Sequence, residues 1–85
     1  MGILDGKIAL VTGGGRGIGR GISEALGREG ATVLINYRRD KEAAEETQKA
    51  IVAAGGKASI HQASTDVPDD CRRMMDEIHA RYGGL

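Results

Sequence analysis

Tyr37 and Lys41 stand four residues apart, the spacing that brings two side chains onto one face of a helix. Such a pair would place a proton donor beside a cation, an arrangement suited to general acid catalysis. Arg38 and Arg39 lie between them, and a guanidinium group binds phosphate through paired hydrogen bonds. The stretch therefore allows two interpretations, a catalytic centre or a binding site for the phosphate of a cofactor.

The choice between them depends on the elements that position these residues. Residues 7–13 form a short apolar run ending in glycine, which predicts a strand buried on both faces of a parallel sheet. Two further strands are predicted at residues 31–36 and 57–64, and helices at residues 17–30, 40–56 and 68–82. Strands that alternate with helices pair in parallel through right-handed crossovers. The predicted fold class is α/β, in the order βαβαβα, as the N-terminal half of a doubly wound parallel sheet.

The predicted helices carry apolar residues at helical spacing. In the first helix these residues are Ile18, Ile22, Ala25 and Leu26. The third helix is expected to bury either Met74 or Met75 together with Ile78. Asp40 is interpreted as the residue that caps the second helix.

A glycine-rich turn, "TGGGRGIG", follows the first predicted strand and opens the first helix. Gly13, Gly17 and Gly19 allow a tight turn and a close approach of a pyrophosphate to the backbone. Free N–H groups at the start of the helix then face the anion. Neither the G-x-G-x-x-G pattern nor a P-loop is present, and a glycine-rich turn can also form without a ligand. Its place between a buried strand and a helix favours ligand binding.

The residues after the second predicted strand indicate which dinucleotide binds. In a doubly wound sheet, the carboxyl end of this strand faces the adenosine ribose. An acidic side chain there would favour NAD(H), whereas Arg38 and Arg39 suit the dianionic 2′-phosphate of NADP(H). Arg16, inside the glycine turn, could reach the same phosphate. The sequence predicts NADP(H), with NAD(H) as the less favoured alternative.

The chain resembles the N-terminal portion of the short-chain dehydrogenase/reductase family, whose signature is T-G-x-x-x-G-x-G. Three stretches carry the resemblance: "GKIALVTGGGRGIG", Asp66-Val67 after the third predicted strand, and "RYGGL". The 3-oxoacyl-acyl-carrier-protein reductase type is the nearest in character. The resemblance implies that residues 1–85 are a partial dinucleotide-binding (Rossmann) domain, truncated before its fourth strand.

The resemblance also implies the roles of individual residues. The expected cofactor-binding residues are Gly13, Gly15, Arg16, Gly17, Ile18, Gly19, Tyr37, Arg38, Arg39, Asp66 and Val67. Asp66 would contact the adenine amino group, and a cap on the third helix is its alternative role. The family's catalytic Ser and Tyr-x-x-x-Lys would lie beyond Leu85. Tyr37 would therefore pack near the adenosine, Lys41 would be solvated, and the chain alone is predicted to be inactive.

The implied function is the cofactor-binding part of an NADP(H)-dependent oxidoreductase that transfers hydride between nicotinamide and a carbonyl or alcohol substrate. A stand-alone, non-catalytic NADP(H)-binding or interaction module is the alternative. A methyltransferase of related fold is disfavoured, because that class generally places an acid after the second strand. The family implies a homo-oligomer for the full-length protein.

Composition and residue spacing argue against several other classes of protein. Twelve basic and twelve acidic residues give no net charge, which argues against a nucleic-acid partner. Cys71 is the single cysteine, and His61 and His79 have no ligand-like spacing to it, so no metal site is expected. No apolar run approaches the roughly 20 residues of a membrane span, and no signal peptide is evident. These features predict a soluble cytoplasmic protein with no membrane partner.

Overall fold

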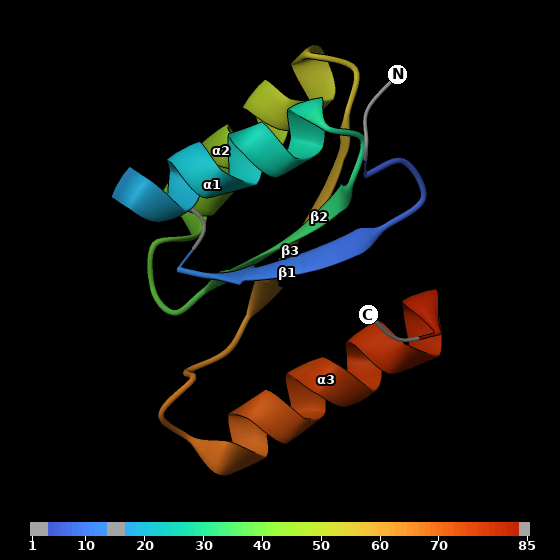
Figure 1. The fold of residues 1–85 in the computed structure, drawn as a ribbon. Coiled ribbons are helices and arrows are strands. Elements are labelled where there is room, and N and C mark those ends of the chain that lie inside the picture. Colours follow the sequence, from blue (N-terminus) through green and yellow to red (C-terminus); the bar gives the residue numbers. More distant parts are fainter. Residues whose placement is uncertain (1–3, 14–16, 84–85) are drawn as a thin grey trace.

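The computed structural model describes residues 4–13 and 17–83. Its helices and strands are β1 Ile8–Thr12, α1 Gly17–Arg28, β2 Thr32–Tyr37, α2 Lys41–Ala53, β3 Lys57–Gln62 and α3 Pro68–Tyr82 (Figure 1). The predicted order βαβαβα is confirmed, with boundaries that differ from the expected ones by a few residues. One difference affects the site, because Tyr37 belongs to β2 whereas the predicted strand ended at Asn36.

The three strands form one parallel sheet with β2 in the centre. Thr32 at the start of β2 lies opposite Ile8 of β1 and Lys57 of β3. Because all the strands run in the same direction, their carboxyl ends meet at one edge of the sheet. This is the strand order expected for the first half of a doubly wound sheet, and the predicted fold class is confirmed.

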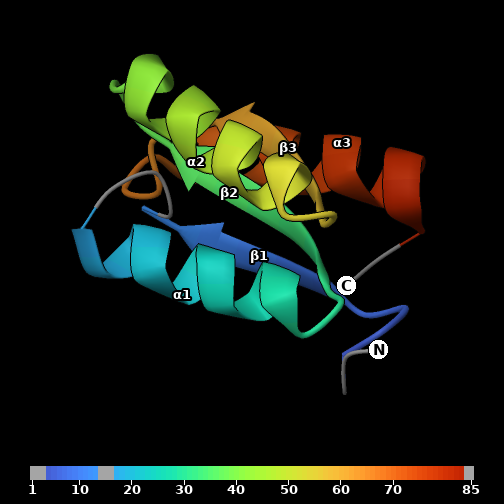
Figure 2. The same cartoon turned by 90° about the horizontal axis from the view of Figure 1, so that it is seen from above.

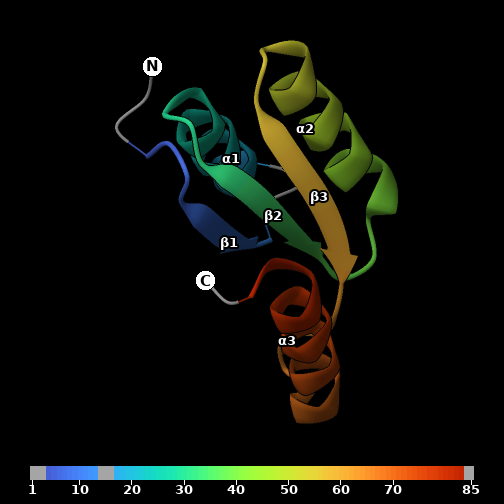
Figure 3. The same ribbon diagram turned by 90° about the vertical axis from the view of Figure 1, so that its right-hand side faces the viewer.

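Helices α1 and α2 cover one face of the sheet and α3 covers the other (Figures 2 and 3). The side chains of β2 alternate between these faces: Val33 and Ile35 pack with α2, and Leu34 packs with α3. All three are fully buried, and burial of each stabilises the fold by about 1.5–3 kcal/mol. The continuous apolar run of β2 therefore reflects a strand that is covered on both faces.

The apolar pattern of α1 marks its buried face only in part. Ile18 is 85% exposed and Ile22 is 48% exposed, while the buried residue of α1 is Ser23. Leu26, another residue of the apolar pattern, does pack against the core formed by β2 and α2, and next to it α1 carries a glycine where it lies close to α2. A Cβ atom added at Gly27 would lie only 2.9 Å from Cγ2 of Ile51. The expectation that the spacing of Ile18 and Ile22 defines the packed face is therefore wrong for the described structure.

Asn36 is a buried polar residue near the end of β2. Its Nδ2 atom donates to the backbone oxygens of His61 and Ala63, each at 3.2 Å, and lies 3.5 Å from Sδ of Met74. These contacts satisfy the amide inside the core, as a buried polar group requires. They also fix the carboxyl ends of β2 and β3 relative to each other.

His61 belongs to a hydrogen-bonded cluster between β3 and α3. Its Nε2 atom lies 2.8 Å from Oγ of Ser59, which in turn lies 3.0 Å from the hydroxyl of Tyr82. Burial lowers the pKa of His61 below its ordinary value, and the nearby charge of Arg81 lowers it further, while Glu77 opposes both effects. The folded chain therefore favours the neutral imidazole.

This shift predicts a pH dependence of stability. A lowered folded-state pKa means that the unfolded chain binds the proton more readily. The stabilisation by neutral His61 is therefore complete above pH 6.5 and is lost as the pH falls through the folded-state pKa. His61→Gln should reduce the slope of the unfolding free energy below pH 6.5, by at most about 1.4 kcal/mol per pH unit. Denaturant unfolding of both proteins between pH 7.5 and 5 measures the slopes, and equal slopes would contradict the prediction.

Candidate functional site

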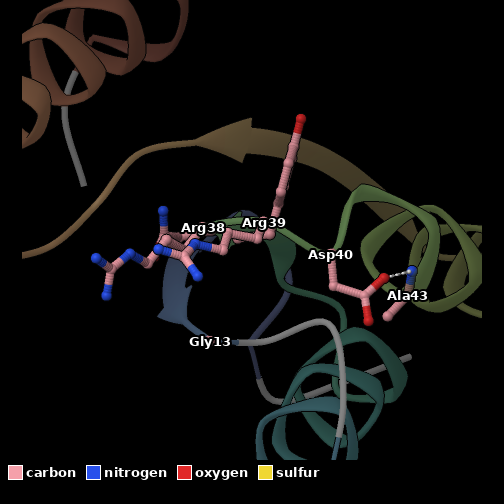
Figure 4. Close-up of a pocket in the computed structure, with 7 residues that line it drawn as sticks. Gly13, Arg38, Arg39, Asp40 and Ala43 are labelled. Carbon is pink, nitrogen blue, oxygen red and sulfur yellow. Dashed lines mark hydrogen bonds between the residues drawn. The ribbon is translucent and has the colours of Figure 1, made fainter.

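A cavity of about 620 Å³ opens at the edge of the sheet where the strands end. Gly13, Asn36, Tyr37, Arg38, Arg39, Asp40 and Ala43 line it (Figure 4). These residues come from the end of β1, the end of β2, the loop that follows β2 and the first turn of α2. This is the place where ligands bind in open α/β sheets, outside the carboxyl ends of the strands.

The loop after β2 is held at both of its ends. On the sheet side, the N–H of Ala63 donates to the carbonyl oxygen of Tyr37 at 3.0 Å. On the helix side, a carboxylate oxygen of Asp40 accepts a 2.9 Å hydrogen bond from the N–H of Ala43. The predicted role of Asp40 as the cap of α2 is confirmed. The cap takes up this carboxylate oxygen, as expected for an acid that stabilises the helix start rather than binding a ribose.

Arg38 and Arg39 give the cavity its positive charge. Figure 4 shows both side chains extending away from Asp40 and Ala43. Arg38 lies 3.6 Å from a carboxylate oxygen of Asp66, and the two side chains are 55% and 64% exposed. An exposed pair of this kind contributes at most about 1 kcal/mol, so a dianionic ligand can compete with Asp66 for the guanidinium. Arg39 forms no ion pair within the residues that the structure describes.

The glycine turn approaches the same cavity from β1. Gly13 lines the cavity with φ of +65°, and Gly17 begins α1 with φ of +61°. These are left-handed conformations, which explains why glycine stands at both positions. No acidic residue occupies the first turn of α1, so its N-terminal N–H groups keep their attraction for an anion. Gly15 and Arg16, which were also predicted to bind the cofactor, lie outside the described residues.

The remaining predicted cofactor-binding residues do not line the cavity. Ile18 and Gly19 lie in the first turn of α1, and Asp66 reaches the cavity only through its ion pair with Arg38. Val67 is not among the residues that line the cavity, and it occupies the cap position of α3 without a side-chain hydrogen bond. The alternative role of Asp66 as that cap is therefore not supported. Its predicted contact with adenine stays a prediction.

Tyr37 and Lys41 do not lie on one helix. Tyr37 is the last residue of β2 and Lys41 is the first residue of α2, so they do not share a helix face. The catalytic interpretation of this spacing is wrong, because residues 37–41 span the end of a strand, a loop and the start of a helix. Sequence reasoning also omitted Asn36 and Ala43 as lining residues. The side-chain amide of Asn36 is engaged in the core, so its residue type gave no signal that this residue lines the cavity.

Other kinds of site find no support in the described residues. Within residues 4–13 and 17–83, no group of three or more His, Cys, Asp or Glu side chains could hold a metal ion. None of the helices in the same part of the chain has the length and apolar character needed to cross a membrane.

Comparison with known proteins gives consistent matches. The sequence model of the family described as short chain dehydrogenase matches residues 7–85. A versicolorin reductase of Emericella nidulans is 46% identical over 82 residues, which are 96% of this chain and 31% of the relative. A tetrahydroxynaphthalene reductase of Pyricularia oryzae is 45% identical over 82 residues, which are 96% of this chain and 29% of the relative. The chain thus spans about a third of the length of these relatives.

Solved structures agree with these matches. A metagenomic short-chain oxidoreductase in complex with NADP superimposes with a TM-score of 0.90 at 38% identity, over 94% of this chain and 36% of the other. The landomycin C-6 ketoreductase with bound NADP and rabelomycin gives a TM-score of 0.86 at 40% identity, over 98% of this chain and 36% of the other.

Proposed function

The chain belongs to the short-chain dehydrogenase family, and we propose that it is the cofactor-binding part of an NADP(H)-dependent oxidoreductase. When bound, the nicotinamide would supply hydride transfer to or from a carbonyl or alcohol substrate. Residues 1–85 then form part of a dinucleotide-binding domain. We assign no catalytic residue within them, so the role of this segment is to bind and orient the cofactor.

One observation carries the proposal. Two guanidinium side chains, Arg38 and Arg39, line the cavity at the end of β2. The nearest acid in sequence, Asp40, is engaged as a helix cap. A planar, permanently charged group suits a phosphate monoester, whereas a ribose diol would call for a carboxylate at this position. NADP in two similar structures supports the same choice of cofactor.

The other side of the cavity fits the pyrophosphate. Gly13 has no side chain to obstruct an approach to the backbone, and a Cβ added there would meet nothing within 4 Å. The start of α1 offers N–H groups without a competing acidic side chain in the first turn. Gly17, Ile18 and Gly19 would then lie along the pyrophosphate, and Tyr37 would pack near the adenosine.

We propose three further properties on the family resemblance alone. These are the 3-oxoacyl-acyl-carrier-protein reductase type, a homo-oligomeric assembly and a cytoplasmic location. The relatives named above carry other names, versicolorin reductase and tetrahydroxynaphthalene reductase. The substrate is proposed only as a carbonyl or alcohol compound.

Titration of the protein at its native length with NADPH and with NADH tests the proposal. We expect NADPH to bind more tightly by about tenfold or more, because it adds charge-assisted hydrogen bonds to the arginines. Oxidation of NADPH in the presence of a carbonyl compound would support the oxidoreductase. Binding without turnover across a panel of ketones would favour the stand-alone module, and tighter binding of NADH would contradict the choice of cofactor.

A further inference from the structure

A side-chain amide continues the hydrogen bonding between β2 and β3 into the loop that carries the arginines. The last backbone hydrogen bond between these segments runs from Ala63 N–H to the carbonyl oxygen of Tyr37. One residue further on, Nε2 of Gln62 donates to the carbonyl oxygen of Arg38 at 3.1 Å. Gln62 therefore holds the backbone of Arg38 at the point where the sheet ends.

A second arginine, from α3, fixes the orientation of this amide. Nη2 of Arg73 donates to the backbone oxygen of Gln62 at 2.9 Å and approaches its side-chain oxygen at 3.4 Å. Nη1 of the same guanidinium donates to a carboxylate oxygen of Glu77 at 3.2 Å. Because a guanidinium only donates, the amide oxygen of Gln62 must face Arg73 and its NH₂ group must face Arg38. The amide therefore has one favourable orientation.

Arg38 is thereby restrained through its backbone. Gln62 holds its carbonyl oxygen, whereas the guanidinium lies 3.6 Å from Asp66 in an exposed pair that a phosphate can displace. The side chain of Arg38 is more than half exposed, so few packing contacts limit its position. The backbone restraint then decides the position from which this long side chain extends into the cavity. Preorganisation of such a side chain lowers the entropy lost when it binds a ligand.

We propose that Gln62 is a positioning residue for dinucleotide selectivity, holding Arg38 where it meets the 2′-phosphate, with Arg73 orienting the Gln62 amide. The inference rests on the proposed function and goes beyond it, because Gln62 lies outside the cavity lining. It acts on the phosphate through Arg38 and makes no contact with the cofactor. Its loss should therefore affect binding of NADPH and leave binding of NADH unchanged.

Gln62→Met removes the hydrogen bond and keeps the length of the side chain. We expect the dissociation constant for NADPH to rise by about two- to fivefold, because one hydrogen bond is lost, while that for NADH stays within about twofold. Gln48→Met is the matched control. Nε2 of Gln48 also donates to a backbone carbonyl, that of Ala58 at 2.9 Å, near the other end of β3. This control should lower the melting temperature without changing the ratio of the two dissociation constants.

Arg73→Met provides a second route to the same test, through the orientation of the amide. It should shift the ratio in the same direction by a smaller factor. Arg72→Met is its control, because Arg72 on the same helix pairs with Asp69 and forms no hydrogen bond or ion pair with β3 in the described residues. The two pairs of variants keep the inference testable if one variant does not fold.

The outcomes separate the two proposals. A ratio that moves in Gln62→Met and Arg73→Met but not in their controls supports the positioning role. A ratio that is the same in both variants as in the unmodified protein, with the unmodified protein still preferring NADPH, overturns this inference alone. If the unmodified protein shows no preference for NADPH, the proposed choice of cofactor and this inference both fail.

Discussion

Replacing Arg38 with Asp and Arg39 with Ser should weaken NADPH binding by about 10- to 100-fold, the equivalent of about 1.4–2.8 kcal/mol. Both guanidinium groups line the cavity after β2, and the exchange removes two cations from the proposed 2′-phosphate site. The new carboxylate would also repel that phosphate. NADH lacks the phosphate, and a carboxylate can accept hydrogen bonds from its ribose, so its affinity should hold or rise. Fluorescence titration of both reduced dinucleotides measures the two dissociation constants.

A control for this exchange is Arg28→Ser. Arg28 is the last residue of α1, at the end of the helix remote from the Gly13 turn, and it does not line the cavity. Its loss should leave the ratio of the dissociation constants unchanged. If the ratio stays constant in the Arg38 and Arg39 variant as well, the two arginines do not bind the 2′-phosphate.

The second large effect concerns the stability of the layer beneath α3. Met74 is 2% exposed and packs with Leu34 and Ile78, whereas the next residue, Met75, is 39% exposed. Met74→Ala should lower the free energy of unfolding by about 2–4 kcal/mol through lost burial and a residual cavity. Met75→Ala should lower it by less than about 1 kcal/mol. Urea denaturation of the two variants and the unmodified protein makes the comparison.

The two methionines are neighbours of the same type, so each serves as the control for the other. Met74 also lies beside the Asn36 amide, at 3.5 Å from Nδ2, which links this core to the end of β2. Equal losses for the two alanine variants, or a larger loss at Met75, would mean that α3 presents a different face to the sheet.

Much of the fold could be predicted from local patterns. The apolar run of β2 and the glycine after β1 depend on neighbouring residues alone, and so does the Asp40 cap. The packed face of α1 could not be predicted in this way. Its contact with α2 is set by close approach at Gly27, and hydrophobic spacing carries no signal for a contact made by glycine. The pattern also could not decide between Met74 and Met75, because two adjacent residues of the same type fit the apolar spacing of the helix about equally well.

The candidate site could be predicted where the type of a residue and its position after a strand indicate its role. Arg38 and Arg39 follow the second strand, and the parallel fold places that end of the strand beside the glycine turn. Gln62 was not predictable, because its bond to Arg38 joins residues 24 apart in sequence. That contact depends on the register of β2 with β3, in which Tyr37 lies opposite Gln62. The ion pair of Arg38 with Asp66 depends on the path of the loop after β3 in the same way.

The central claim is that this cavity recognises a ribose 2′-phosphate. Calorimetric titration of the unmodified protein with adenosine 2′,5′-bisphosphate and with adenosine 5′-monophosphate isolates that group from the rest of the cofactor. We predict that the bisphosphate binds at least about tenfold more tightly, because only its 2′-phosphate can engage Arg38 and Arg39. Equal affinities for the two nucleotides would contradict the claim, because the arginines would then contribute nothing to recognition of the phosphate.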